Sequence, residues 1–187
     1  MSKNSFLLFA FSLLLLPIQA DALDTIYVVR HAEKESGWPA ARETSSMHPL
    51  SVAGVARTGR LAERLDDAGI AAIYTSQTTR TMHTGLALSR SQEIPLVADM
   101  ATVSESEIGA FLDGLRERHT DDHAVLIVGH SNTVPMLLRA LGVATECDEA
   151  MGISEHSYGP GIEGYEGLWS VNLSRPGCEG ALRSVLP

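Results

Sequence analysis

The chain has 187 residues, of which 44% are hydrophobic and 20% are charged, with 14 basic against 23 acidic residues. It is too apolar for an intrinsically disordered protein, and it is long enough to bury a core without metal or disulfide staples. A net charge of −9 without a basic cluster argues against nonspecific nucleic-acid binding. We therefore expect a folded enzyme or binding protein whose partner is not nucleic acid.

The amino terminus has the layout of a secretory signal peptide. Lys3 precedes an apolar run over 6–16, and Ala20-Asp21-Ala22 forms a small-x-small cleavage pattern. The run is shorter than the about 20 apolar residues that span a bilayer, although an uncleaved anchor is the alternative. We expect a signal peptide over 1–22 and a periplasmic or secreted mature chain without stable membrane insertion.

Strand-like and helix-like segments alternate along the rest of the chain. The expected strands are 25–29, 71–74, 94–97, 124–128, 168–173 and 181–186, and the expected helices are 51–67, 78–89, 104–119 and 133–141. This alternation predicts a three-layer α/β/α sandwich with a largely parallel central sheet, built as a single domain over 23–187. Two segments, Gly37–Pro49 and Ser154–Gly167, are predicted to be loops.

Local signals mark the ends and faces of two of these helices. Ser51 suits the N-cap of the first helix, and its apolar residues recur at helical spacing. They are Val52, Val55, Leu61 and Leu65. The third helix is predicted to open with a capping box, Ser104-x-x-Glu107.

Two of the expected strands end in a histidine. Thr25–Val29 leads into Arg30 and His31, and the apolar run 124–128 leads through one glycine into His130. Ligands bind beyond the carboxyl ends of strands in open parallel sheets, so neighbouring strands would bring the two histidines together. A histidine that leaves a buried strand has a fixed backbone, as a nucleophile or a preorganised donor needs. One such histidine is more often structural, but two at equivalent positions favour a functional site.

A third element adds a second arginine. Ser76-x-x-x-Arg80-x-x-x-Thr84 stands where the second expected strand passes into its helix, again at the carboxyl end of the sheet. Arg30 adjoins a buried strand, where an unpaired charge would be costly. Two guanidiniums and two imidazoles suit a phosphoryl group, whose charge is spread over three oxygens. The pattern predicts a pocket for a small phosphorylated substrate.

The ordered motifs resemble those of the histidine phosphatase superfamily, also called phosphoglycerate mutase-like. The motifs that carry the resemblance are Val28-Val29-Arg30-His31-Ala32-Glu33, Leu50-Ser51-x-x-Gly54, Ser76-x-x-x-Arg80-x-x-x-Thr84 and Gly129-His130-Ser131. The resemblance extends from Thr25 to the region of Leu141. Ala32 stands where many members have glycine, but the step Arg-His-Ala is similar to the small exported bacterial branch.

The resemblance implies a role for each core residue. His31 would be the nucleophile that takes the phosphoryl group as a phosphohistidine, and water would then hydrolyse this intermediate. Arg30, Arg80 and His130 would bind the phosphoryl oxygens. Neutral imidazole is a competent nucleophile near pH 7. We expect an exported phosphomonoesterase that needs no metal and no other cofactor, because the arginines supply the positive charge.

The proton donor to the leaving group is less clearly marked. The family often takes an acidic residue from the segment between the second arginine and the second histidine, where Glu105 and Glu107 stand. Glu107 is accounted for by the capping box, so Glu105 is our candidate for the catalytic acid. Glu33, beside the nucleophile, is the reserve.

Other functions and features are weighed against this interpretation. A phosphoglycerate-type mutase and a phosphohistidine-protein phosphatase are alternatives, although both act in the cytoplasm and export counts against them. A non-catalytic phosphate-binding envelope protein is a further alternative. His119 and His123 are spaced as helical metal ligands, but the polar residues between them indicate a helix end, so no metal site is expected.

The cysteines leave one question open. Cys147 and Cys178 could form a disulfide in an oxidising compartment, or they could remain as two buried thiols, because sequence does not give their distance. The oligomeric state is equally open at this stage.

Overall fold

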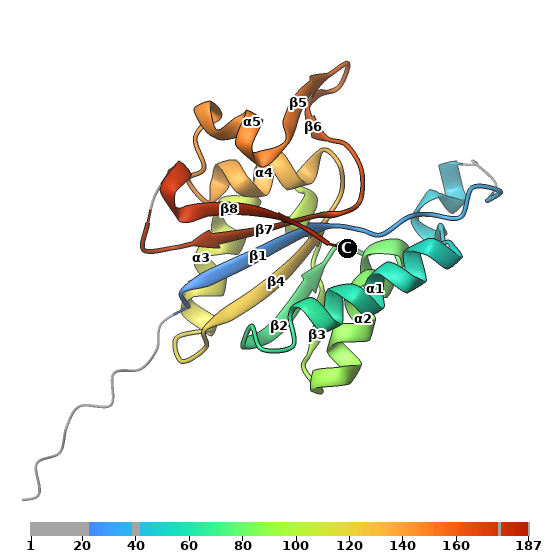
Figure 1. Cartoon of the computed structure of the whole chain (residues 1–187), viewed down its shortest axis with the longest axis horizontal. Helices are drawn as coiled ribbons and strands as arrows, with labels where there is room; N and C mark the ends of the chain where they lie inside the picture. Colours follow the sequence, from blue (N-terminus) through green and yellow to red (C-terminus); the bar gives the residue numbers. More distant parts are fainter. Residues whose placement is uncertain (1–22, 39–41, 176, 187) are drawn as a thin grey trace, which may run out of the picture.

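A six-stranded sheet forms the centre of the computed structural model, which describes residues 23–38, 42–175 and 177–186 (Figure 1). The predicted signal peptide at 1–22 lies outside the described residues. The strands lie in the order β3-β2-β4-β1-β7-β8. Their bounds are β1 Thr25–Arg30, β2 Ile70–Thr75, β3 Leu96–Ala98, β4 Ala124–Gly129, β7 Gly167–Asn172 and β8 Ala181–Val185.

Helices cover both faces of the sheet, so the predicted three-layer α/β/α sandwich is confirmed (Figure 1). One face packs against α1 and α2, and the other packs against α3, α4 and α5. The helix bounds are α1 Val52–Arg64, α2 Thr79–Gln92, α3 Ile108–Arg118, α4 Thr133–Ala140 and α5 Asp148–Met151. A two-stranded hairpin, β5 Ile153–His156 with β6 Gly159–Ile162, stands beside α4.

The strand directions explain where a ligand can bind. β1, β2, β3 and β4 are mutually parallel, and β7 pairs antiparallel with β1. The chain leaves β1 through α1 on one face and leaves β4 through α4 on the other, so the two connections diverge between these neighbouring strands. A crevice at the carboxyl ends of such a pair is the usual ligand site of an open α/β sheet.

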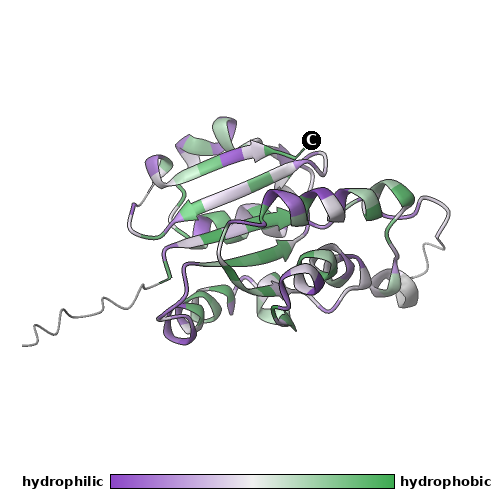
Figure 2. Ribbon diagram, turned by 60° about the horizontal axis from the view of Figure 1, so that its bottom comes forward, coloured by the Kyte–Doolittle hydropathy of each residue, from purple (hydrophilic) through white to green (hydrophobic). Residues whose placement is uncertain are grey.

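The hydrophobic core lies on both sides of β1 and β4. Every residue of β4 is buried, and green hydrophobic colour is concentrated in the inner strands of the sheet (Figure 2). Fully buried strands on a mostly parallel sheet have apolar residues on both faces. Ile26 and Ile127 face the α3 and α4 layer, whereas Val29 and Leu126 face α1 and α2. The backbone that carries the two histidines is therefore anchored in the core.

The first helix turns a different face to the core from the one predicted. Its cap is as expected, since the Ser51 hydroxyl accepts a hydrogen bond from the Gly54 N–H at 3.1 Å. Val52 and Val55 are nevertheless exposed, at 88% and 59% of their surface. The buried side of the first turn is Gly54, because the backbone of the segment after β1 crosses there and leaves no room for a side chain.

Two further predictions about secondary structure were wrong. The third helix begins at Ile108 and has no capping box, because the Ser104 hydroxyl pairs with Ser106 and the Glu107 side chain makes no cap hydrogen bond. The predicted loop 154–167 contains most of the β5–β6 hairpin. Its glycines and proline hid the strand pattern, since such residues are depleted in strands.

The question left open by the cysteines has an answer in the structure. Cys147 and Cys178 form a disulfide that ties the turn before α5 to the turn before β8. Across the part of the chain that the structure describes, no helix is both long and apolar enough to cross a membrane.

Candidate active site

The two strand-end histidines meet at the junction of β1 and β4. Arg30 and Gly129 are register partners in the parallel ladder, and the His31 N–H donates to the Gly129 carbonyl at 2.9 Å. The His31 and His130 rings lie edge to face with their centroids 5.3 Å apart. The prediction that these strands are neighbours and bring their histidines together is confirmed.

His31 presents one ring nitrogen to the pocket in a defined state. Its Nδ1 lies 2.8 Å from the Ala32 carbonyl oxygen, which can only accept, so Nδ1 carries the proton. The lone pair of neutral His31 is therefore on Nε2, which has no hydrogen-bond partner among the described residues. The side chain is 4% exposed and lines a cavity of about 370 Å³. This is the arrangement that a nucleophilic imidazole requires.

The surroundings of His31 keep it uncharged. Burial lowers its pKa to about 3, and the positive charges of Arg80 and Arg30 lower it further, against an opposing hydrogen bond to the Ala32 carbonyl. Because this value lies far below neutral pH, the imidazole is unprotonated and nucleophilic under ordinary conditions.

His130 has the opposite hydrogen-bonding pattern. Its Nδ1 lies 3.3 Å from a guanidinium nitrogen of Arg80, which can only donate, so Nδ1 accepts and Nε2 carries the proton. That Nε2–H group donates to the Ser76 hydroxyl at 2.9 Å. Burial lowers the pKa of His130 to about 4, and Arg80 and Arg30 add to the effect. Both ring nitrogens are thus engaged within the protein, and His130 holds Arg80 in place.

Arg30 is held by the loop that follows the hairpin. Its Nη1 donates to the Gly164 carbonyl at 2.7 Å, and its guanidinium lies 4.2 Å from the centre of the Tyr165 ring. The same ring is 5.9 Å from that of His31. The sequence analysis missed Tyr165 as a site residue, because nothing in a glycine-rich loop showed that it folds back onto β1.

The pocket is a cationic one in an acidic protein. Arg30, Lys34 and Arg80 line it together with the two histidines, and none of its lining residues is Asp or Glu. Burial and the charge of Arg30 lower the pKa of Arg80, a direction that records how closely the two cations are held. The Nε atoms of both arginines are buried without a hydrogen-bond partner. An anion with several oxygens would relieve this repulsion and use the remaining donors.

The remaining motif positions hold the backbone around His31. The Thr84 hydroxyl accepts from the Ala32 N–H at 2.9 Å and donates to the Arg80 carbonyl at 2.7 Å, which joins the nucleophile's loop to α2. The Ser51 N–H donates to the Glu33 carbonyl at 2.9 Å. A side chain at Gly54 would collide with that same carbonyl. The motif residues outside the pocket therefore position the residues inside it.

The candidate acids lie outside the pocket. Glu105 is exposed and lines an adjacent cavity, which shares Asn132 with the phosphate pocket. Glu33 is bound by Arg57 at 2.6 Å, and this hydrogen-bonded contact lowers the pKa of the Glu33 carboxyl. A carboxylate that is held ionised is a poor proton donor, so Glu33 is ruled out as the reserve acid. Glu105 stays a prediction.

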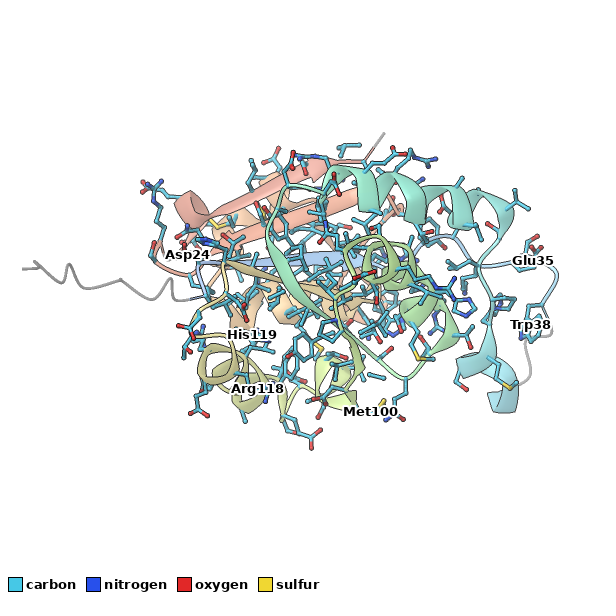
Figure 3. The ribbon with its side chains drawn as sticks, turned by 90° about the horizontal axis from the view of Figure 1, so that it is seen from below. Asp24, Glu35, Trp38, Met100, Arg118 and His119 are labelled. Atoms are coloured by element: carbon cyan, nitrogen blue, oxygen red, sulfur yellow. A yellow bond between two sulfur atoms is a disulfide. The ribbon has the colours of Figure 1, made fainter. Side chains whose placement is uncertain are left out.

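The other histidines are not part of the pocket. His119 lies at the end of the molecule marked by Asp24, opposite the end that carries Glu35 and Trp38 (Figure 3). Its Nε2 contacts the Tyr74 hydroxyl at 2.8 Å and its Nδ1 contacts Asp122 at 2.6 Å. Within residues 23–38, 42–175 and 177–186, no group of three or more His, Cys, Asp or Glu side chains could hold a metal ion.

Comparison with known proteins agrees with this geometry. The family model described as histidine phosphatase superfamily (branch 1) matches residues 26–111, which include three of the four motifs. The fourth motif, at Gly129-His130-Ser131, lies beyond the match, and the fold places it beside His31. No curated protein matches the sequence.

Several solved structures share the fold at low sequence identity. SixA from Agrobacterium tumefaciens is 22% identical, with a TM-score of 0.58 over 80% of this chain and 90% of that one. A protein histidine phosphatase SixA complexed with tungstate is 17% identical, with a TM-score of 0.60 over 86% and 93%. The alpha-ribazole phosphatase from Shigella flexneri is 14% identical, with a TM-score of 0.59 over 87% and 95%.

The family match, the fold and the paired histidines identify the chain as a member of the histidine phosphatase superfamily. The resemblance seen in its motifs is confirmed, and the class of protein is a phosphatase enzyme.

Proposed function

We propose that the protein is an exported, metal-independent phosphomonoesterase that works through a phosphohistidine on His31. The observation that carries the proposal is the unpartnered Nε2 of a neutral, buried His31 in a pocket lined by three cations. A phosphate monoester is the ligand class that joins a transferable phosphoryl centre to several charged oxygens.

The first step is transfer of the phosphoryl group to the enzyme. The Nε2 lone pair attacks phosphorus and forms the P–N bond while the P–O bond to the alcohol breaks. The electron pair of that bond leaves on the alcohol oxygen, which takes up a proton from Glu105 or from water. Arg30 and Arg80 stabilise the charge on the transferring group, since preorganised donors act most strongly in a shielded site.

The second step returns the enzyme to its starting state. Water attacks phosphorus, the P–N bond breaks, and its electron pair returns to Nε2 of His31. The water proton leaves to solvent or to the carboxylate that acted as the acid. The same cationic pocket serves both steps, because each moves a phosphoryl group along the same line.

Export is the part of the proposal that rests on the amino terminus. The signal-peptide pattern at 1–22 supports it, and the Cys147–Cys178 disulfide supports it independently. Disulfides persist in the periplasm and outside the cell but are rare in reducing cytoplasm. An exported enzyme of this kind would meet phosphate esters outside the inner membrane.

The test is turnover of an aryl phosphate by the purified chain in the presence of EDTA. We expect EDTA-insensitive phosphate release and an acid-labile, alkali-stable phosphoprotein when turnover is quenched early. Activity that disappears with EDTA and returns with a divalent metal would overturn the mechanism. The tungstate complex of the similarly folded SixA suggests tungstate, a tetrahedral oxyanion, as a competitive inhibitor to try first. A cytoplasmic location in cell fractionation would remove the export part and revive the mutase and protein-phosphatase alternatives.

A further inference from the structure

A second cavity, of about 660 Å³, opens beside the phosphate pocket, and Asn132 lines both. It follows α4 from Asn132 to Ala140, with the start of α3 on one side and the hairpin on the other. Much of its wall is apolar, through Ile108, Pro135, Met136, Tyr158 and Pro160. A phosphate held at His31 would therefore have its ester group directed either to solvent or into this cavity.

The hairpin wall of the cavity is tied to the active site. The Ile162 N–H donates to the Ser131 carbonyl at 3.0 Å, so β6 is fastened to the residue that follows His130. Tyr158 stacks on His156 with their ring centroids 5.0 Å apart and their planes 3° from parallel. Both rings pack over Gly161, where a side chain would collide with them. This stack holds Tyr158 in place although 58% of its surface is exposed.

The charge of the cavity differs from that of the phosphate pocket. Arg139 lines it, but its guanidinium is bound by the Asp148 carboxylate and by the Val143 and Ala144 carbonyls, each of these two at 3.0 Å. Glu105 lines it too, and within the described part of the chain it has neither a hydrogen-bond partner nor an ion pair. The remaining charge on the wall is therefore negative.

We infer that this cavity is the leaving-group subsite, and that it selects phosphate monoesters of alcohols with a flat apolar body that is uncharged or cationic. Tyr158 and Met136 supply the apolar contact, and Glu105 disfavours alcohols that carry a carboxylate or a second phosphate. The inference rests on the proposed phosphatase function, since it assigns the part of the substrate that the phosphate pocket leaves out.

Binding tests the subsite without requiring turnover. Naphthylmethylphosphonate and methylphosphonate share a phosphonate that does not hydrolyse, and only the first carries a flat apolar body. We expect the naphthyl compound to bind at least about tenfold more tightly by calorimetry, because aromatic stacking adds to area burial. A ratio near one would overturn the subsite, whether or not the protein turns over any ester.

A filled cavity is the sharper variant. Ala140 is exposed on α4 and lines the cavity, so Ala140→Phe is expected to block it and remove the preference for the naphthyl compound. Ala110→Phe is the matched control, because Ala110 is an exposed α3 residue that lines neither cavity. Methylphosphonate should bind both variants as it binds the wild type. Equal loss of both ligands in Ala140→Phe would show damage to the phosphate pocket instead and would contradict the inference.

Kinetics distinguish the subsite from the proposed function. For naphthyl phosphate, Tyr158→Ala should lower kcat/KM about fivefold to tenfold and leave that for ethyl phosphate within about twofold. Leu182→Ala, which removes another exposed apolar side chain, should change neither. Glu105→Gln should improve 3-phosphoglycerate relative to naphthyl phosphate. Unselective losses in Tyr158→Ala would refute the subsite, whereas full activity in His31→Ala would refute the phosphohistidine mechanism and leave the binding result standing.

Discussion

The ends of β1 and β4 are alike in position and unlike in chemistry. Each strand is buried and parallel to the other, and each is followed at once by a histidine that burial keeps neutral. At the end of β1 the protein holds His31 by Nδ1 and leaves Nε2 unpartnered. At the end of β4 it engages both nitrogens of His130, one with Arg80 and one with Ser76.

The difference shows that topology brings residues to the site, whereas hydrogen-bond partners divide the roles among them. A backbone carbonyl next to a ring nitrogen fixes one tautomer, and an arginine in the same place fixes the other. By this criterion His31 is the nucleophile and His130 positions a cation, although both follow equivalent strands. Each of the four predictions below either widens or removes that contrast.

Removing the nucleophile should have the largest effect. His31→Ala deletes the atom that forms the covalent bond, so we expect kcat to fall by about 10⁴-fold or more. His130→Ala leaves Nε2 of His31 in place and should lower kcat by about 10²-fold to 10³-fold. Initial rates with an aryl phosphate measure both, and the phosphoprotein should still form in His130→Ala alone. Equal losses with no phosphoprotein in either variant would mean that the two histidines are not divided in this way.

The guanidinium that His130 holds should come next. Arg80→Ala removes a positive charge from the transferring phosphoryl group, and about 10²-fold to 10³-fold in kcat/KM is typical for such a donor. Arg64→Ala is the control, because Arg64 lies on α1 and does not line the phosphate pocket. Steady-state kinetics and tungstate inhibition should weaken together in Arg80→Ala. Unchanged tungstate affinity would show that Arg80 does not face the anion.

The sequence was sufficient for the parts of this site that depend on strand topology. Period, composition and the apolar run of β4 predict the parallel sheet, and with it the meeting of His31 and His130. Contacts made by the loop after β6 were not predictable, because Tyr165 reaches Arg30 across 135 positions of the chain without any local pattern. The exposed faces of Val52 and Val55 were mispredicted for a related reason, since a crossing backbone decides which side of α1 is buried.

Acid should destabilise the fold through the same two histidines. Their pKa values, about 3 for His31 and about 4 for His130, lie below the ordinary value of 6.5, so the unfolded chain binds more protons between these limits. Their neutral-state stability is therefore complete above the unfolded pKa and is lost as the pH falls from there toward the folded values. Relative to His31→Gln, the wild type should lose about 2 kcal/mol more unfolding free energy between about pH 6.5 and pH 4.5.

Urea denaturation at the two pH values measures this difference, with the disulfide left intact in both proteins. The paired carboxylates, such as Glu33 with Arg57, lose stability in the same direction but are common to both chains and cancel in the comparison. Parallel stability curves for the two proteins would mean that His31 is protonated as easily in the fold as in the unfolded chain.

The smallest effect expected is also the closest test of how His130 is positioned. Ser76 is buried and accepts the His130 Nε2–H, and its own hydroxyl is anchored by Thr81 at 3.0 Å. Ser76→Ala leaves that N–H without its acceptor, and we expect kcat to fall about threefold to tenfold, the size of one ordinary hydrogen bond. Ser91→Ala is the matched control, because the Ser91 hydroxyl bonds only within α2, to the Leu88 carbonyl. Nitrogen NMR of the imidazoles should show a mixed tautomer for His130 in Ser76→Ala and an unchanged His31, since a merely structural loss would move both. A His130 that keeps its single tautomer without Ser76 would transfer the whole positioning role to Arg80.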